Sequence, residues 1–175
     1  MKRIAFLSAF ALGLFALVPS FALADSTTHT FNLVFFAPNM GEAPNGDHVA
    51  VTGGGAFSVN PKSVTASGSF IHTDSTGNVL GGGTWTATAL LDYQSYGCGE
   101  VFGTPLPPNF CGGKLKMRVS LTTPLGQLDG ILTVFCVVGP NPPNSHDEDG
   151  VTLDVPGVIN FNHAAGGGNV YVQIN

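Results

Sequence analysis

Alternating apolar and polar side chains are the feature that most constrains the fold of this chain. In the stretch "GTWTATALLDY", which runs from Gly83 to Tyr93, successive residues fall on opposite faces of a strand. No segment after residue 24 sustains the 3.6-residue apolar period of an amphipathic helix. Glycine and proline, with 24 and 12 residues, are also poor helix formers. The sequence therefore predicts an all-β protein.

Eight or nine antiparallel strands are expected, joined mostly by short turns. Turn-forming residues predict three hairpins, around "DSTG" (74–77), "TPLG" (123–126) and "AAGGG" (164–168). Consecutive hairpins favour a meander-type β-barrel, and a two-sheet β-sandwich is the alternative. Glycines within strands, such as Gly81–Gly83, would allow sharp bends or bulges. The expected strands are His29–Ala37, His48–Val59, Ser63–Thr73, Asn78–Tyr96, Lys114–Thr122, Gln127–Val138, Val151–Val155, Gly157–His163 and Asn169–Asn175.

The first 24 residues have the pattern of a bacterial-type secretory signal peptide. A positively charged start is followed by the apolar run Ile4–Val18 and by "ALA" at 22–24, a small-x-small cleavage site. We expect cleavage between Ala24 and Asp25. The remaining 151 of the 175 residues, 25–175, suit one all-β domain. The sequence therefore predicts a secreted protein, either extracellular or periplasmic.

The charge of the chain excludes nucleic acid as a partner. Without the two basic residues of the signal peptide, four Lys and Arg stand against eleven Asp and Glu, so the net charge is −7. Affinity for nucleic acid comes largely from neutralisation of phosphates by Lys and Arg. Three of the four cations, Lys114, Lys116 and Arg118, share one strand face. That face is either a soluble outer surface or a site for an anionic group.

Stable membrane insertion is not expected after removal of the signal peptide. No later apolar run is long enough for a membrane-spanning helix. An outer-membrane β-barrel is a remote alternative, because it needs an apolar outward face and a polar lumen. The charged face of Lys114, Lys116 and Arg118 argues against it.

Three cysteines, Cys98, Cys111 and Cys136, would meet an oxidising compartment after secretion. They allow one disulfide in three pairings and leave one thiol. Cys98 and Cys111 flank a loop rich in proline and glycine, so a Cys98–Cys111 bridge is favoured. Cys111 with Cys136 is the closest rival, because both should lie near the same end of one hairpin. Cys136 lies in the apolar stretch "LTVFCVV", where a buried, inert thiol is expected.

The stretch from 84 to 94 predicts one buried face and one solvent face. Its threonines suit solvent, and Trp85 would be the largest buried side chain. A flat threonine ladder that binds ice or polysaccharide would need several parallel copies, and the chain offers one. The expected inward residues are Trp85, Ala87, Ala89, Leu91 and Tyr93.

Histidines are the best candidates for chemistry, although they are scattered along the chain. In "GSFIHTD", Phe70, His72 and Asp74 share one face, which would place His72 near a barrel mouth with Asp74 able to hold its ring. His163 also ends a strand and is a possible third member of the site. A histidine with a purely structural role is the alternative interpretation of His72.

A cluster of three acids, Asp147, Glu148 and Asp149, could hold a calcium ion. The spacing of an EF-hand loop is absent, so a solvated acidic loop is the alternative interpretation. Ligand spacings for zinc or copper are also absent, and no cofactor is expected. The chain lacks the motifs of nucleophile-elbow hydrolases, P-loop proteins, zinc proteases and dinucleotide-binding enzymes.

Several short motifs resemble those of a group of small exported bacterial β-proteins of uncharacterised function. They are the Gly-x-Phe strand at Gly55–Phe57, the Ser-Phe-x-His-x-Asp-x-x-Gly hairpin at Ser69–Gly77, the Gly-Thr-Trp-Thr-Ala-Thr stretch at Gly83–Thr88, and Ser95–Gly97. A weaker likeness continues through "LTVFC" and "NFN" and covers most of the chain after residue 24. The resemblance implies no activity, ligand or cofactor.

Two interpretations of function follow. The first is a non-enzymatic secreted β-domain that binds a small ligand or has a structural or surface role, with His72, Tyr93 and Tyr96 as candidate ligand-binding residues. An eight-stranded barrel is wide enough to hold one small ligand. The second is an enzyme of unknown reaction that uses His72 and Asp74. A cavity would favour ligand binding, because an interior filled by Trp85 and its neighbours could hold no ligand.

Overall fold

The computed structural model of the chain describes residues 28–143 and 148–175. The predicted signal peptide, 1–24, and its cleavage site lie outside these residues. Within them the chain forms strands and no helix, so the all-β prediction is confirmed. The strands are β1 (Thr30–Ala37), β2 (Asn39–Glu42), β3 (His48–Ser58), β4 (Ser63–Thr73), β5 (Val79–Cys98), β6 (Glu100–Val101), β7 (Thr104–Pro105), β8 (Phe110–Thr123), β9 (Gly126–Cys136), β10 (Gly150–Val155), β11 (Ile159–Phe161), β12 (His163–Ala164) and β13 (Gly168–Gln173).

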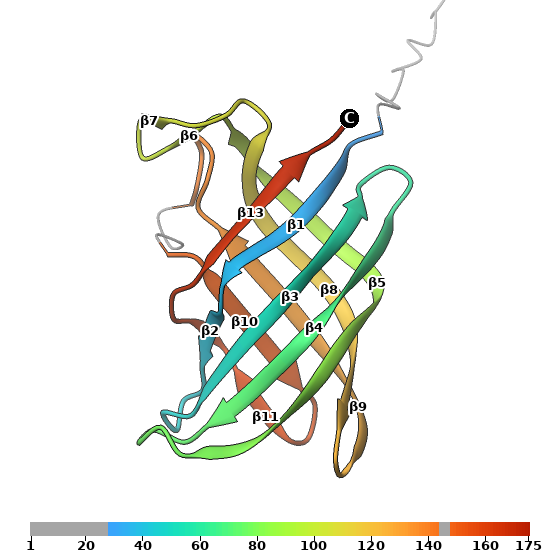
Figure 1. Cartoon of the computed structure of the whole chain (residues 1–175), viewed down its shortest axis with the longest axis vertical. Coiled ribbons are helices and arrows are strands. Elements are labelled where there is room, and N and C mark those ends of the chain that lie inside the picture. Colours follow the sequence, from blue (N-terminus) through green and yellow to red (C-terminus); the bar gives the residue numbers. More distant parts are fainter. Residues whose placement is uncertain (1–27, 144–147) are drawn as a thin grey trace, which may run out of the picture.

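Six antiparallel strands are linked in an unbroken cycle. β1 pairs with β3, β3 with β4, β4 with β5, β5 with β8, β8 with β13, and β13 with β1. Two branches leave this ring: β9, β10 and β11 follow from β8, and β2 and β12 follow from β3. β10 then packs beside β2 and β12. The cycle of ladders is the arrangement that a barrel predicts. The layers in Figure 1, where β13, β1, β3 and β4 lie in front of β8, β9 and β10, are compatible with the sandwich alternative.

Two of the three expected hairpins are confirmed, and the third is wrong. β4 and β5 join at 74–77, and β8 and β9 join at Thr123–Gly126. The segments expected to pair around 164–168 do not pair with each other. β11 instead forms a hairpin with β10, where Val158 N donates to the carbonyl of Val155 in a tight turn. β13 pairs with β1 and β8, and the turn-rich stretch before β3 contains the strand β2.

The interior between the layers is filled over most of its length. Near the end that carries β6, β7 and the C-terminus, the rings of Phe31, Phe57, Tyr93 and Tyr171 pack with centroids 5.0–5.7 Å apart. Trp85 lies further along the interior, and its Nε1 donates a 2.9 Å hydrogen bond to the Thr52 carbonyl. Such a bond satisfies the polar atom of a buried tryptophan.

The inward face of β5 differs from the expected one. The β5–β8 register shifts between Ala87 and Ala89 and again between Leu90 and Asp92, so an extra residue lies opposite β8 at each place. Because each β-bulge reverses the alternation, Leu90 is buried although it was expected to face solvent. Trp85, before the first shift, is buried as expected.

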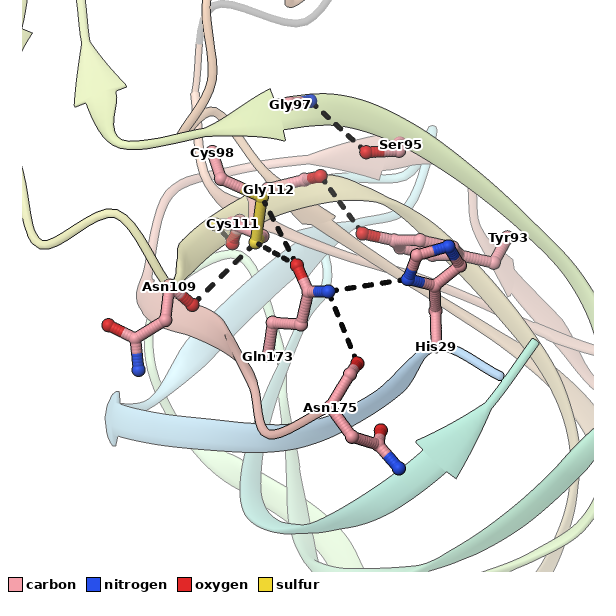
Figure 2. Close-up of a disulfide and its surroundings, with 11 residues drawn as sticks. His29, Tyr93, Ser95, Gly97, Cys98, Asn109, Cys111, Gly112, Gln173 and Asn175 are labelled. Atoms are coloured by element: carbon pink, nitrogen blue, oxygen red, sulfur yellow. Dashed lines mark hydrogen bonds between the residues drawn. A yellow bond between two sulfur atoms is a disulfide. The ribbon is translucent and has the colours of Figure 1, made fainter. Parts of the chain in front are cut away.

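Cys98 and Cys111 form a disulfide, which confirms the favoured pairing. The two cysteines are cross-strand partners at the end of β5 and the start of β8, so the bond closes the loop that contains β6 and β7. Figure 2 shows Gln173 of β13 beside it, with Nε2 of Gln173 3.3 Å from Nδ1 of His29. Cys136 is a buried free thiol, as expected. This pairing is consistent with an oxidising compartment.

Candidate ligand-binding site

A cavity of about 650 Å³ opens at the end of the molecule opposite the disulfide. Figure 1 shows this end at the bottom, where the β4–β5, β8–β9 and β10–β11 turns gather. We call the cavity the cup. Its walls are largely aliphatic and aromatic side chains from the two layers. It is lined by Val49, Phe70, His72, Leu80–Gly82, Leu121, Thr123–Leu128, Leu153, Val155, Val158, Ile159 and Phe161.

Missing side chains on β5 make room for the cup. Phe70 of β4 is paired with Gly83 of β5, and His72 is paired with Gly81. Paired residues of an antiparallel ladder point to the same face, so both glycines lie where inward side chains would stand. A Cβ atom at Gly83 would overlap the Thr122 carbonyl oxygen, whereas a Cβ at Gly81 would meet nothing within 4 Å. The glycine run therefore leaves empty space beside His72.

Trp85 closes the floor of the cup. Beneath the cup, Val51, Trp85 and Leu132 meet Phe70, Leu121 and Leu153 around a space too small for a water molecule. Gly68 lies opposite Trp85 on β4 and approaches β3 so closely that a Cβ there would overlap the Thr52 carbonyl oxygen. Trp85 and its neighbours therefore fill the interior beneath the cup, and the cup itself remains open, which is the observation that favours ligand binding.

His72 brings a hydrogen-bonding group to the wall of the cup. Its Nε2 lies 2.9 Å from Oδ2 of Asp47, which lies in the turn between β2 and β3. The ring also packs edge-on against Phe161, with centroids 5.2 Å apart and an interplanar angle of 86°. In the tautomer that donates from Nε2 to this carboxylate, Nδ1 is an acceptor. Within the described residues, Nδ1 has no hydrogen-bond partner.

The prediction that Asp74 holds the ring of His72 is wrong. Asp74 folds back onto its own turn, where its Oδ1 accepts hydrogen bonds from the backbone of Thr76 and Asn78 and from the Thr76 hydroxyl. The side-chain amide of Asn78 donates to Oδ2 at 2.9 Å. These hydrogen bonds, led by that of Asn78, hold the pKa of Asp74 well below its usual range. Asp74 therefore stabilises the β4–β5 turn. Asp47 holds the ring of His72, which is the role expected of Asp74.

Tyr93 and Tyr96 lie outside the cup. Tyr93 belongs to the aromatic cluster near the disulfide, and Figure 2 shows its hydroxyl pointing to the carbonyl of Gly112, 3.2 Å away. Burial raises the pKa of Tyr93 to about 12. Tyr96 is almost fully buried, and burial also raises its pKa. Tyr93 packs against the hydrophobic core and Tyr96 is buried outside the cup, so His72 alone of the three candidate ligand-binding residues lines the cup.

His163 does not line the cup either. Its Nδ1 lies 3.8 Å from Oε2 of Glu42, its cross-strand partner on β2, and both side chains are substantially exposed. The two residues flank a shallow hollow with Asn162 and Pro44. The structure therefore does not bring His163 and His72 into one cavity.

The acidic cluster divides into residues with different surroundings. Asp147 lies outside the described residues, and Glu148 is exposed. The carboxylate of Asp149 accepts a 2.9 Å hydrogen bond from Val137 N, just after the end of β9. Burial raises the pKa of Asp149 above its usual value. Among residues 28–143 and 148–175, no group of three His, Cys, Asp or Glu side chains could hold a metal ion.

The cup offers hydrogen bonding and apolar contact. A histidine held by a carboxylate can serve as a general base. Among the described residues that line the cup, none is serine, cysteine or lysine, so His72 has no neighbour there of the kinds that most often act as nucleophiles. The hydroxyl of Thr123 and the amide of Gln127 bond within the β8–β9 hairpin, to Gly126 and Ser120. His72 is therefore the polar group best placed to meet a ligand.

No family model, curated protein or solved structure matches the chain. The part of the chain that the structure describes contains no helix able to cross a membrane.

Proposed function

We propose that this chain is a secreted, non-enzymatic binding protein that holds one small, largely apolar molecule in the cup. The observation that carries the proposal is the cavity itself. Its volume of about 650 Å³ falls within the range of small-molecule sites. Apolar walls with a single well-placed polar group are typical of such sites. The Cys98–Cys111 disulfide and the predicted signal peptide support secretion.

The chemistry of the walls favours a neutral ligand. No Lys or Arg lies among the described residues of the lining. A carboxylate entering the cup would lose its hydration. It would also approach His72, whose Nε2 already bonds to the carboxylate of Asp47. A hydroxyl group, in contrast, could donate to Nδ1 of His72 without bringing in a charge. The proposed ligand is therefore an apolar molecule with one hydrogen-bond donor.

Displacement of a neutral dye from the cup by competing ligands tests this proposal. Nile red should bind the purified mature protein and become fluorescent in the cup. Decanol, decanoate and decylammonium share one chain and differ in the charge of their head group. We expect decanol to displace the dye at concentrations at least about tenfold lower than either ion, because the cup offers a charged group no full partner. Equal displacement by all three, or none by decanol, would contradict the proposal.

A matched pair of variants assigns the dye to the cup. Gly81→Phe places a ring in the empty space beside His72, and it should abolish dye binding while leaving the fold intact. Ile71→Phe adds a ring to the exposed outer face of the same strand pair and should bind the dye like the wild type. If both variants bind alike, the dye does not occupy the cup.

A further inference from the structure

The edge of the cup carries exposed apolar side chains that lie in, or next to, three separate turns. Leu80 follows the β4–β5 turn, Leu125 lies at the tip of the β8–β9 hairpin, and Val158 lies in the β10–β11 turn. Their exposed fractions are 58, 100 and 63 %, and all three also line the cup. We call these three residues the rim. Apolar side chains gathered at the tips of neighbouring loops indicate a contact surface.

The charges of the chain separate this end from the rest of the molecule. Asp47 and Asp74 lie in the turns that adjoin the rim. The basic residues of the described chain lie elsewhere. Lys62 precedes β4 at the opposite end and donates to the Leu91 carbonyl, and Lys114, Lys116 and Arg118 alternate along β8. A surface for an anionic partner would place Lys or Arg around the rim, whereas the turns that adjoin this rim carry acids.

We propose that the rim docks onto the surface of a zwitterionic lipid bilayer, and that the ligand enters the cup from the lipid. This inference rests on the proposed function for the origin of the ligand. A molecule that is apolar except for one hydroxyl partitions into lipid, so a protein that collects it gains by opening its cavity against a bilayer. Leucine and valine tips that insert between head groups would provide the contact. The lack of Lys and Arg at the rim selects zwitterionic over anionic lipid.

Flotation with phosphatidylcholine vesicles tests the docking. The wild-type mature protein should float with the vesicles, and the double variant Leu125→Asp/Val158→Asp should partition at least about tenfold less, since burial of two aliphatic side chains is lost. Both residues are exposed in turns, so the fold should persist. Phe102→Asp is the matched control, because Phe102 is 68 % exposed in the β6–β7 turn at the other end, and it should float like the wild type.

Three outcomes would overturn the docking. The first is a wild type that stays with the soluble fraction. The second is flotation that rises when phosphatidylglycerol is added and falls with salt, which would assign the contact to the cations of β8. The third is a rim variant that floats unchanged but loses a dimer detected by light scattering, which would make a second copy of the chain the occupant.

The Gly81→Phe variant separates this inference from the proposed function. It fills the cup and leaves the rim residues unchanged, so it should float like the wild type although it binds no dye. A wild type that binds Nile red in solution but does not float would leave the binding function standing and remove the docking. A wild type that floats but binds no dye would leave the docking standing and remove the binding function.

Discussion

The imidazole of His72 and the carboxylate of Asp47 form a pair between two hairpins, with Nε2 and Oδ2 2.9 Å apart. His72 lies near the end of β4, and Asp47 lies just before β3, the strand that pairs with β4. The side chains are 24 and 13 % exposed, so the pair is shielded from most of the solvent. The carboxylate favours the tautomer that donates from Nε2, and this leaves Nδ1 of His72, a residue that lines the cup, as an acceptor.

Replacement of His72 by phenylalanine should remove the preference of the cup for an alcohol. The ring volume and the packing on Phe161 are largely kept, and the nitrogen acceptor is lost. A hydrogen bond of this kind contributes about 1–1.5 kcal/mol, so the affinity for decanol should fall roughly tenfold. Displacement of Nile red measures the affinity, and the affinity for the dye itself should change little.

Asp74→Asn provides the control for the histidine variant. Asp74 is two residues from His72 but bonds only within its turn, so the variant should keep the wild-type affinity for decanol. If His72→Phe fails to fold, Asp47→Asn offers a milder test, because it removes the charge that orients the ring. Unchanged decanol binding in folded His72→Phe would show that the histidine has a structural role only.

A buried pair of amides joins strands that are distant in the sequence. Asn169 Nδ2 donates to Oδ1 of Asn39 at 2.6 Å and to the carbonyl of Phe135 at 2.9 Å. Asn169→Ala should lower the free energy of unfolding by about 2–4 kcal/mol, because the Asn39 amide oxygen loses a donor in the interior. Urea denaturation measures the change. Asn160→Ala, on the exposed side of β11, should change it by less than about 0.5 kcal/mol.

The sequence predicts the strands well because the alternation of burial is local. Leu115, Met117 and Val119 are fully buried and Lys116 is exposed, as the two-residue period of that segment predicts. Hairpin turns are also local, and the Asp74 turn forms where its side-chain acceptor and glycine predict it. The favoured disulfide was predictable for the same reason, because both cysteines flank one short loop.

The parts of the fold and of the site that the sequence did not predict depend on contacts between distant residues, which leave no local pattern in the sequence. The partner of His72 lies 25 residues away, and nothing near Asp47 distinguishes it from other turn acids. The register shift after Ala87 could not be predicted, because residues on both sides of it alternate equally well. The cup arises beside Gly81, where β5 leaves out an inward side chain, and a glycine run in a strand indicates a bend or bulge as readily as a cavity. The pairing of β13 with β1 likewise joins strands that lie near opposite ends of the described residues, and β13 also pairs with β8, from the middle of the chain.

Loss of the disulfide should lower stability without affecting ligand binding. The Cys98→Ser/Cys111→Ser double variant removes a cross-link between residues 13 apart, which contributes about 3 kcal/mol in the chain-entropy model. Because the disulfide and the cup lie at opposite ends, the affinity for Nile red should be unchanged. Chemical denaturation and dye titration of the same preparation check both expectations. A weaker dye affinity in a fully folded sample would show that the two ends are coupled.

Cys136 should be unreactive in the native protein. Burial, together with the nearby charge of Asp149, raises the pKa of its thiol to about 12. The thiolate is the nucleophile, so alkylation by iodoacetamide at pH 8 should be at least about a thousandfold slower than in the denatured chain. Intact mass after labelling should show one adduct in denaturant and none under native conditions. Rapid native labelling would contradict the burial of this strand.

Replacement of Asp149 by asparagine should change how stability depends on pH. Burial raises the pKa of Asp149 in the folded state above its ordinary value of 3.8, so folding favours the protonated carboxyl. Well below pH 3.8 the carboxyl is protonated in both the folded and the unfolded state, and it does not lower stability. As the pH rises from 3.8 through the folded-state pKa, the unfolded chain ionises more easily than the folded protein, so the wild type loses stability. Asparagine does not ionise, and its oxygen can still accept the Val137 N–H bond.

The difference in unfolding free energy between Asp149→Asn and the wild type should therefore shift in favour of the variant as the pH rises from 3 towards 7. The direction of this shift is the prediction, because any fixed cost of the new amide hydrogens is the same at every pH. Titration of the other carboxylates is common to both proteins and cancels in the difference. Urea denaturation at several pH values measures it. A difference that stays constant across this range would show that the carboxyl of Asp149 is no more buried in the folded state than in the unfolded chain.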